Sequence, residues 1–130
     1  MVDISSKSFL VVDDEPFIQK LAVRVLTQIG VTAIDTAGNG VEALAHLDEA
    51  AAPPDVMLVD LSMPEMGGAE LIRHLGERGY AGAVIMVSGA DEETLTIAEG
   101  MAKFRDLKVL GHITKPLTPP PLEELLGGLD

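Results

Sequence analysis

The chain has 130 residues, of which 47% are hydrophobic and 3% aromatic, and its formal net charge is −12. So acidic a chain is not expected to bind nucleic acid, because that requires Lys and Arg side chains to neutralise phosphate groups. It contains no cysteine, which excludes disulfides, zinc–thiolate sites and cysteine nucleophiles.

Five short β-prone runs, each followed by a helical pattern, make up most of the chain. Three of the runs are wholly apolar, which is typical of strands buried on both faces of a parallel sheet. The expected strands are, in chain order, residues 9–12, 31–36, 56–59, 83–87 and 108–114. The helices expected after them begin at Pro16, at Asn39-Gly40, after Gly67-Gly68, near Asp91 and before Leu122.

Five consecutive β–α units imply parallel strands joined by right-handed crossovers. We therefore predict a doubly wound α/β fold with helices on both faces of a five-stranded parallel sheet. Residues 1–130 are expected to form a single domain, with residues 1–7 disordered. The apolar runs are too short to cross a membrane and no secretory signal precedes Phe9, so a soluble cytoplasmic protein is expected.

Polar side chains stand where four of the expected strands end. They are Asp13 and Asp14, Asp60, Ser88 and Lys115. In an open parallel sheet, ligands bind outside the carboxyl ends of the strands, so these side chains should converge. Three converging carboxylates repel one another unless a cation binds, and in the absence of Cys and nearby His their oxygens favour Mg²⁺, Mn²⁺ or Ca²⁺ over zinc.

A carboxylate can also attack phosphorus as a nucleophile, which makes Asp60 a candidate phosphoryl acceptor. In that reaction the Lys115 ammonium and the Ser88 hydroxyl would contact phosphoryl oxygens. Structural explanations compete with this reading. Asp13-Asp14 could cap the following helix, Asp60 and Ser88 could be turn residues, and Lys115 could be an ordinary surface lysine.

Four motifs occur at strand ends, in the order found in one family. They are Val11-Val-Asp-Asp-Glu-Pro16, Asp60-Leu-Ser-Met-Pro-Glu-Met-Gly-Gly68, Val87-Ser88-Gly89 and Lys115-Pro116. On these motifs the chain resembles the receiver domains of two-component response regulators, from about Phe9 to Leu129. The resemblance implies a flavodoxin-like (βα)5 fold with strand order 2-1-3-4-5.

The resemblance also implies a Mg²⁺-dependent phosphoswitch. Asp60 would accept a phosphoryl group from a sensor histidine kinase or a phosphotransfer protein, and the domain would catalyse only its own phosphorylation and dephosphorylation. Asp14 would bind the metal directly while Asp13 positions it, and Asp60 and the Ser62 backbone carbonyl would be the remaining protein ligands. Lys115 would pair with Asp60 before phosphorylation.

By the same resemblance, Ser88 would turn toward the phosphoryl group and change the surface around the fourth helix. An output domain or a downstream protein would then bind the face formed by that helix, the fifth strand and the fifth helix, or a dimer would form. His112 occupies the switch position at which this family usually has Tyr or Phe. Either inward packing is weaker here and pH biases the switch, or the His112 side chain simply points to solvent.

Four further interpretations of the chain were considered. The segment 108–111 is similar to receivers fused to EAL-type cyclic-di-GMP phosphodiesterase domains, so the chain could be part of a larger regulator. A pseudo-receiver would act only as an interaction module, but such a protein should lack the acceptor or the lysine. A haloacid-dehalogenase-like phosphatase would need Asp-x-Asp and a cap, and flavin binding would need more aromatic residues.

Overall fold

The computed structural model describes residues 4–61, 68–89, 96, 99–100 and 106–129. The elements in these ranges are η1 (Ile4–Ser6), β1 (Ser8–Val12), α1 (Pro16–Gln28), β2 (Ala33–Ala37), α2 (Gly40–Glu49), β3 (Val56–Asp60), α3 (Gly68–Glu77), β4 (Ala83–Ser88), β5 (Lys108–Thr114) and α5 (Pro119–Leu126). The helix expected from about Asp91 to Lys103 lies mostly outside the described residues.

The five strands form one parallel sheet in the order β2-β1-β3-β4-β5, as predicted. The three central strands, β1, β3 and β4, are almost completely buried, which explains their uninterrupted apolar sequences. β2 and β5 lie at the two edges of the sheet, and their sequences contain more polar and exposed residues.

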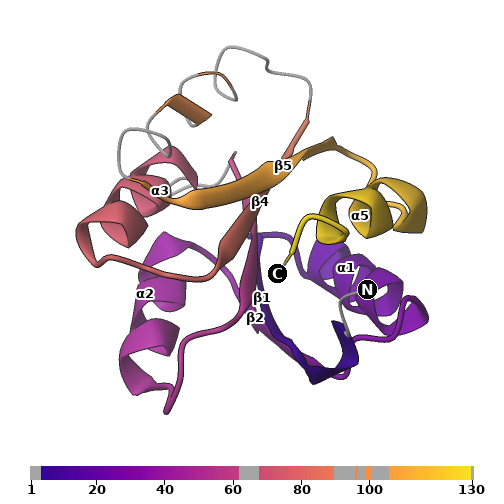
Figure 1. The fold of residues 1–130 in the computed structure, drawn as a ribbon, viewed down its shortest axis with the longest axis horizontal. Helices are drawn as coiled ribbons and strands as arrows, with labels where there is room; N and C mark the ends of the chain where they lie inside the picture. The colour runs from indigo at the N-terminus through magenta and orange to yellow at the C-terminus, as the bar shows by residue number, and fades with distance from the viewer. Residues whose placement is uncertain (1–3, 62–67, 90–95, 97–98, 101–105, 130) are drawn as a thin grey trace.

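Two hydrophobic cores lie on opposite faces of this sheet, because successive side chains of a strand point in opposite directions. Leu10 and Val12 pack with residues of α2 and α3, whereas Phe9 and Val11 pack with residues of α1 and α5. Figure 1 shows the same arrangement, with α2 and α3 on one side of the sheet and α1 and α5 on the other. The prediction of helices on both faces is therefore confirmed.

The N-terminal segment differs from expectation. The sequence predicts disorder over residues 1–7, but Ile4–Ser6 form a 3-10 helix, and the Thr32 hydroxyl donates a hydrogen bond to the Ser5 carbonyl at 3.2 Å. Ile4 also packs against the core on the α1 side. These contacts are made with segments distant in the chain, and the sequence of residues 4–6 alone carries no clear signal of them. Residues 1–3 lie outside the described residues.

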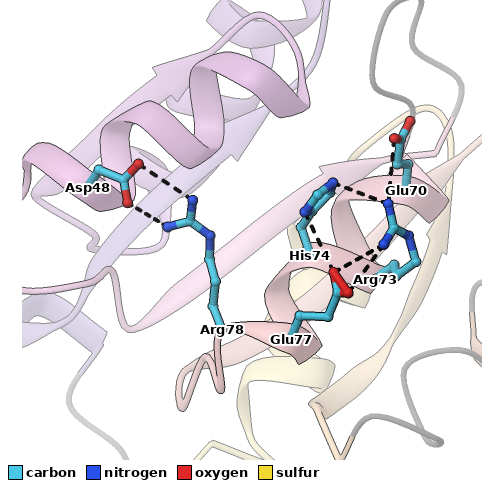
Figure 2. A network of polar contacts seen from close by, with 6 residues as sticks. All are labelled: Asp48, Glu70, Arg73, His74, Glu77 and Arg78. Carbon is cyan, nitrogen blue, oxygen red and sulfur yellow. Dashed lines mark hydrogen bonds and ion pairs between the residues drawn. The ribbon is translucent and has the colours of Figure 1, made fainter.

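Polar contacts on the surface of α2 and α3 are shown in Figure 2. Arg78, just beyond the end of α3, forms an ion pair with Asp48 of α2, and its hydrogen bond lowers the pKa of the Asp48 carboxyl. Within α3, Arg73 contacts Glu70 and Glu77. These groups are largely exposed, so each pair is expected to contribute little to stability. The Asp48–Arg78 pair links α2 to the end of α3, whereas the Arg73 pairs lie within α3. None of the helices in the described part of the chain has the length and apolar character needed to cross a membrane.

Candidate functional site

Three buried polar side chains meet at the carboxyl end of the sheet. Asp13 directly follows β1, Asp60 ends β3 and Ser88 ends β4. Their exposed fractions are 2%, 2% and 5%, and they are the buried polar or charged residues of the described part of the chain. Burying a carboxylate is costly unless it is paired, so this concentration of polar groups indicates a built site.

Lys115, immediately after β5, is the cation of this site. Its Nζ lies 3.3 Å from Asp13 Oδ2 and 3.4 Å from Asp60 Oδ2, and its side chain is 24% exposed. Burial by itself lowers the pKa of Lys115, but the charges of Asp60 and Asp13 outweigh it, so the pKa lies above its usual value. The sequence predicted the pair with Asp60; the second pair, with Asp13, is a finding of the structure.

Backbone hydrogen bonds beyond the strands hold these residues in place. The Leu61 amide donates to the Val87 carbonyl at 3.0 Å, and the Lys115 amide donates to the Ser88 carbonyl at 2.8 Å. The ends of β3, β4 and β5 are therefore tied together next to the buried carboxylates. The Lys115–Pro116 peptide bond is cis.

Asp13 also organises the loop between β1 and α1. Its Oδ1 accepts a hydrogen bond from the Glu15 amide at 2.9 Å, and the Gln19 side chain donates to the Asp13 carbonyl at 2.6 Å. Asp13 is not the helix cap considered as an alternative, because the N-cap of α1 is Glu15 and no side chain caps this helix. The Asp13 side chain instead holds the Glu15 amide and forms the ion pair with Lys115. Gln19 is a supporting residue that the sequence reasoning missed, because a half-buried amide on a helix carries no distinctive pattern.

Gly68 is required by the close approach of α3 to the end of β3. A Cβ atom at this position would lie 2.5 Å from both the Asp60 carbonyl oxygen and the Leu61 Cα. Real Cβ atoms do not come so close, so only glycine allows the first turn of α3 to rest on the end of β3. The sequence placed Gly68 in a motif, and the structure supplies its physical reason.

The carboxylates of Asp13, Asp14 and Asp60 form a candidate metal centre. One oxygen of each lies within 4.8 Å of the others, with Asp13 and Asp60 buried and Asp14 exposed. An all-oxygen donor set that is open to solvent on one side suits a hard cation that keeps several waters, as Mg²⁺ does. The structure thus brings together three of the predicted ligands. Ser62, the fourth, lies outside the described residues.

His112, the predicted switch residue, lies on β5 opposite Met86, which belongs to the core beneath α2 and α3. Its side chain is 46% exposed, and its Nδ1 lies 3.5 Å from Glu99 Oε1. In this structure the imidazole therefore contacts a carboxylate at the surface. Weaker inward packing with a pH bias and simple exposure to solvent both stay predictions for His112.

Comparison with known proteins gives the same family as the motifs in the sequence. A family model for the response regulator receiver domain matches residues 9–126. The positive alginate biosynthesis regulatory protein of Pseudomonas aeruginosa is 32% identical over 119 residues, which are 90% of this chain and 44% of that protein. The cyclic di-GMP phosphodiesterase RocR of the same species is 33% identical over 109 residues, which are 84% of this chain and 28% of RocR.

A solved structure shares the fold over nearly the whole chain. It is the CheX–CheY complex with BeF3 and Mg from Borrelia burgdorferi, which is 27% identical with a TM-score of 0.78 and is matched over 92% of this chain and 86% of that one. The chain spans less than half the length of the two curated relatives above.

Proposed function

The chain belongs to the response regulator receiver domain family, and on that premise we propose that it is a phosphoswitch of a two-component phosphorelay whose acceptor is Asp60. One observation carries the proposal: the Lys115 ammonium lies within 3.4 Å of the buried Asp60 carboxylate, at the carboxyl end of the sheet. A carboxylate held beside a fixed cation is a nucleophile next to a group that can stabilise transferred charge.

Each residue of the site would have its own role in phosphoryl transfer. Asp60 would supply the oxygen that attacks phosphorus while the bond from phosphorus to the donor breaks, the donor being a histidine nitrogen or the acetate oxygen of acetyl phosphate. Lys115 would leave its ion pair to contact an oxygen of the incoming phosphoryl group. The Ser88 hydroxyl, at the end of the neighbouring strand, would donate a hydrogen bond to another oxygen. Little covalent chemistry is required beyond positioning and charge stabilisation, so a domain of this kind would catalyse only its own phosphorylation and dephosphorylation.

Mg²⁺ is the cofactor we propose for this site. Asp13, Asp14 and Asp60, with the Ser62 carbonyl, would hold it, and the bound ion would neutralise negative charge on the phosphoryl oxygens. Because Asp13 is already paired with Lys115, Asp14 is the carboxylate most open to the ion.

The surface around the start of α1 is where we propose that the phosphoryl donor binds. Phe17 is 74% exposed on the first turn of α1, and Lys20 and Arg24 lie beside it with Leu21. An exposed aromatic side chain flanked by cations, on a chain of net charge −12, favours a partner with an acidic and apolar surface. A sensor kinase or phosphotransfer protein in the cytoplasm would have to contact this region to reach Asp60.

The output would be carried by the face that contains β5 and α5. His112 lies on this face, and its contact with Glu99 joins β5 to the segment before it. Because β5 pairs with β4, a movement of Ser88 at the end of β4 would change the conformation of this face. An output domain in the same polypeptide, a separate protein or a second copy of the domain would bind there. The relation to a cyclic di-GMP phosphodiesterase makes an output domain of that kind one candidate.

Mass spectrometry after incubation with acetyl phosphate and Mg²⁺ tests the acceptor. The wild type should gain the mass of one phosphoryl group, Asp60→Asn should gain none, and Asp48→Asn, an exposed matched control, should behave as the wild type. Omission of Mg²⁺ should abolish the gain. A folded wild-type protein that stays unmodified would refute the proposal and favour a phosphorylation-independent interaction module.

The donor surface is tested separately with the cognate kinase. Phe17→Ala should slow phosphotransfer from the kinase while leaving phosphorylation by acetyl phosphate unchanged, because the small donor does not need that surface. Val41→Ala provides the control, since Val41 is also an exposed apolar side chain, at 53%, but lies on α2. Equal slowing by both substitutions would contradict the assignment of the α1 surface.

A further inference from the structure

A cavity of about 270 Å³ lies between α1 and the segment that follows β5. Ile18, Leu21 and Ala22 of α1 form one wall, and Leu117 contributes to the other. Residues of the three central strands, such as Leu58, form its floor. The cavity opens at the carboxyl end of the sheet, because Asp13, Asp60 and Lys115 also line it.

The charged residues at this opening already pair with one another. Lys115 contacts both Asp13 and Asp60, so the cation of the opening is engaged by two carboxylates. The remaining lining is aliphatic except for the Pro116 ring. Within the aliphatic part of the cavity, a charged ligand would lose its hydration without gaining a counter-charge, whereas a neutral apolar molecule would lose little.

The size of the cavity narrows the class of ligand further. An apolar cavity of about 150 Å³ is enough to bind benzene, and drug-sized ligands need roughly 300 Å³ or more. The present cavity, at about 270 Å³, lies between these limits. It therefore suits a substituted benzene or a small bicyclic ring system.

We propose that this cavity is a binding site for a small neutral aromatic molecule and that its occupation slows phosphorylation of Asp60. The kinetic part rests on the proposed function. When Asp60 is phosphorylated, Lys115 must leave its present position, and the same chain segment carries Pro116 and Leu117, which line the cavity. A ligand that fits the present arrangement stabilises it, and by linkage opposes the change.

Binding is measured with 4-fluorotoluene as the probe, by fluorine NMR and by thermal unfolding. At about ten times the dissociation constant, the melting temperature should rise by roughly 5 °C. Nuclear Overhauser effects should connect the probe to methyl groups of Ile18, Leu58 and Leu117. Contacts instead with Leu71 or Leu75, which lie in the opposite core, or no binding up to the solubility limit of the probe, would overturn the proposal.

A substitution that fills the cavity provides a matched test of the binding site. Ala22→Leu places a larger side chain into the cavity from α1 and should abolish probe binding without lowering the melting temperature. Ala43→Leu makes the same change in α2, in the opposite core, and should lower the melting temperature while binding is retained. Equal destabilisation by the two substitutions, or undiminished binding to Ala22→Leu, would show that the cavity is not the site. The contacts observed by NMR in the wild type do not depend on either variant folding.

The kinetic part is tested with acetyl phosphate and Mg²⁺. Saturating 4-fluorotoluene should reduce the phosphorylation rate of the wild type at least twofold and leave the rate of Ala22→Leu unaffected. Equal wild-type rates with and without bound probe would overturn the proposed coupling. Absence of phosphorylation without the probe would instead count against the proposed function, and binding would still be tested by NMR and thermal unfolding.

Discussion

Replacing Lys115 by methionine removes the cation between two buried carboxylates and keeps a side chain of similar length. At an effective dielectric constant of about 20, a charge 3.3 or 3.4 Å away contributes roughly 5 kcal/mol of attraction to each carboxylate. Most of this is offset by the cost of removing the ammonium group from water. Breaking a buried pair typically costs 3–5 kcal/mol, and because Lys115 is 24% exposed we expect about 3 kcal/mol.

Urea unfolding in EDTA, which removes divalent cations, measures this loss. For a slope of about 2 kcal/mol per molar, the midpoint of Lys115→Met should fall by roughly 1.5 M. Lys20→Met, on the exposed surface of α1, is the control and should change the free energy of unfolding by at most about 0.5 kcal/mol. If both substitutions shift the midpoint equally, the ion pairs do not stabilise the fold and the reasoning is wrong.

A second substitution and a pH series sharpen the test. Asp60→Asn in the Lys115→Met background should recover part of the lost stability, because it removes an uncompensated carboxylate. The pKa of Lys115 is raised in the folded state, so its contribution is fully present below its ordinary value of 10.5 and is lost as the pH rises through the raised value. The difference in stability between wild type and Lys115→Met should therefore stay constant from neutral pH to about pH 10 and shrink above it.

Other substitutions probe the close contacts and the switch. Gly68→Ala should destabilise the protein by about 1–3 kcal/mol in urea unfolding, because its Cβ collides with the backbone at Asp60; Gly89→Ala, in open space, should be close to neutral. Tyr80→Phe removes the hydrogen bond to the Pro54 carbonyl at 2.7 Å and should cost about 1 kcal/mol by the same measurement. If His112 biases the switch through pH, a phosphorylation-dependent binding assay should depend on pH in the wild type and not in His112→Tyr; identical pH profiles would discard the idea.

Much of the fold could be predicted from the sequence because its signals are local. A fully apolar run such as residues 56–59 is incompatible with an exposed strand. Five β-prone runs in alternation with helices leave few arrangements other than a doubly wound sheet. The fourth helix is the exception that stays a prediction, since most of it lies outside the described residues. The order of residues 4–6 was missed because it involves tertiary contacts, the packing of Ile4 and the hydrogen bond to the Ser5 carbonyl.

The candidate site was predictable for a related reason. A charged residue at the end of a buried strand must find a partner. The positions of Asp13, Asp60 and Lys115 at strand ends therefore predicted that they lie close together. Their sequence separation carried no information on which pairs would form. That Lys115 contacts Asp13 as well as Asp60 depends on how β5 packs beside β4 and on side-chain orientation, neither of which is encoded in a local pattern.

By itself, the sequence determined the succession of strands and helices and the kinds of side chain at the carboxyl end of the sheet. Both follow from backbone periodicity and from the cost of burying charge, which act over a few residues. Only the tertiary structure decided that Gly68 must carry no side chain, that His112 contacts Glu99 and that a cavity remains beside Ala22. Each of these depends on distances between segments far apart in the chain, which are set when the helices pack against the sheet.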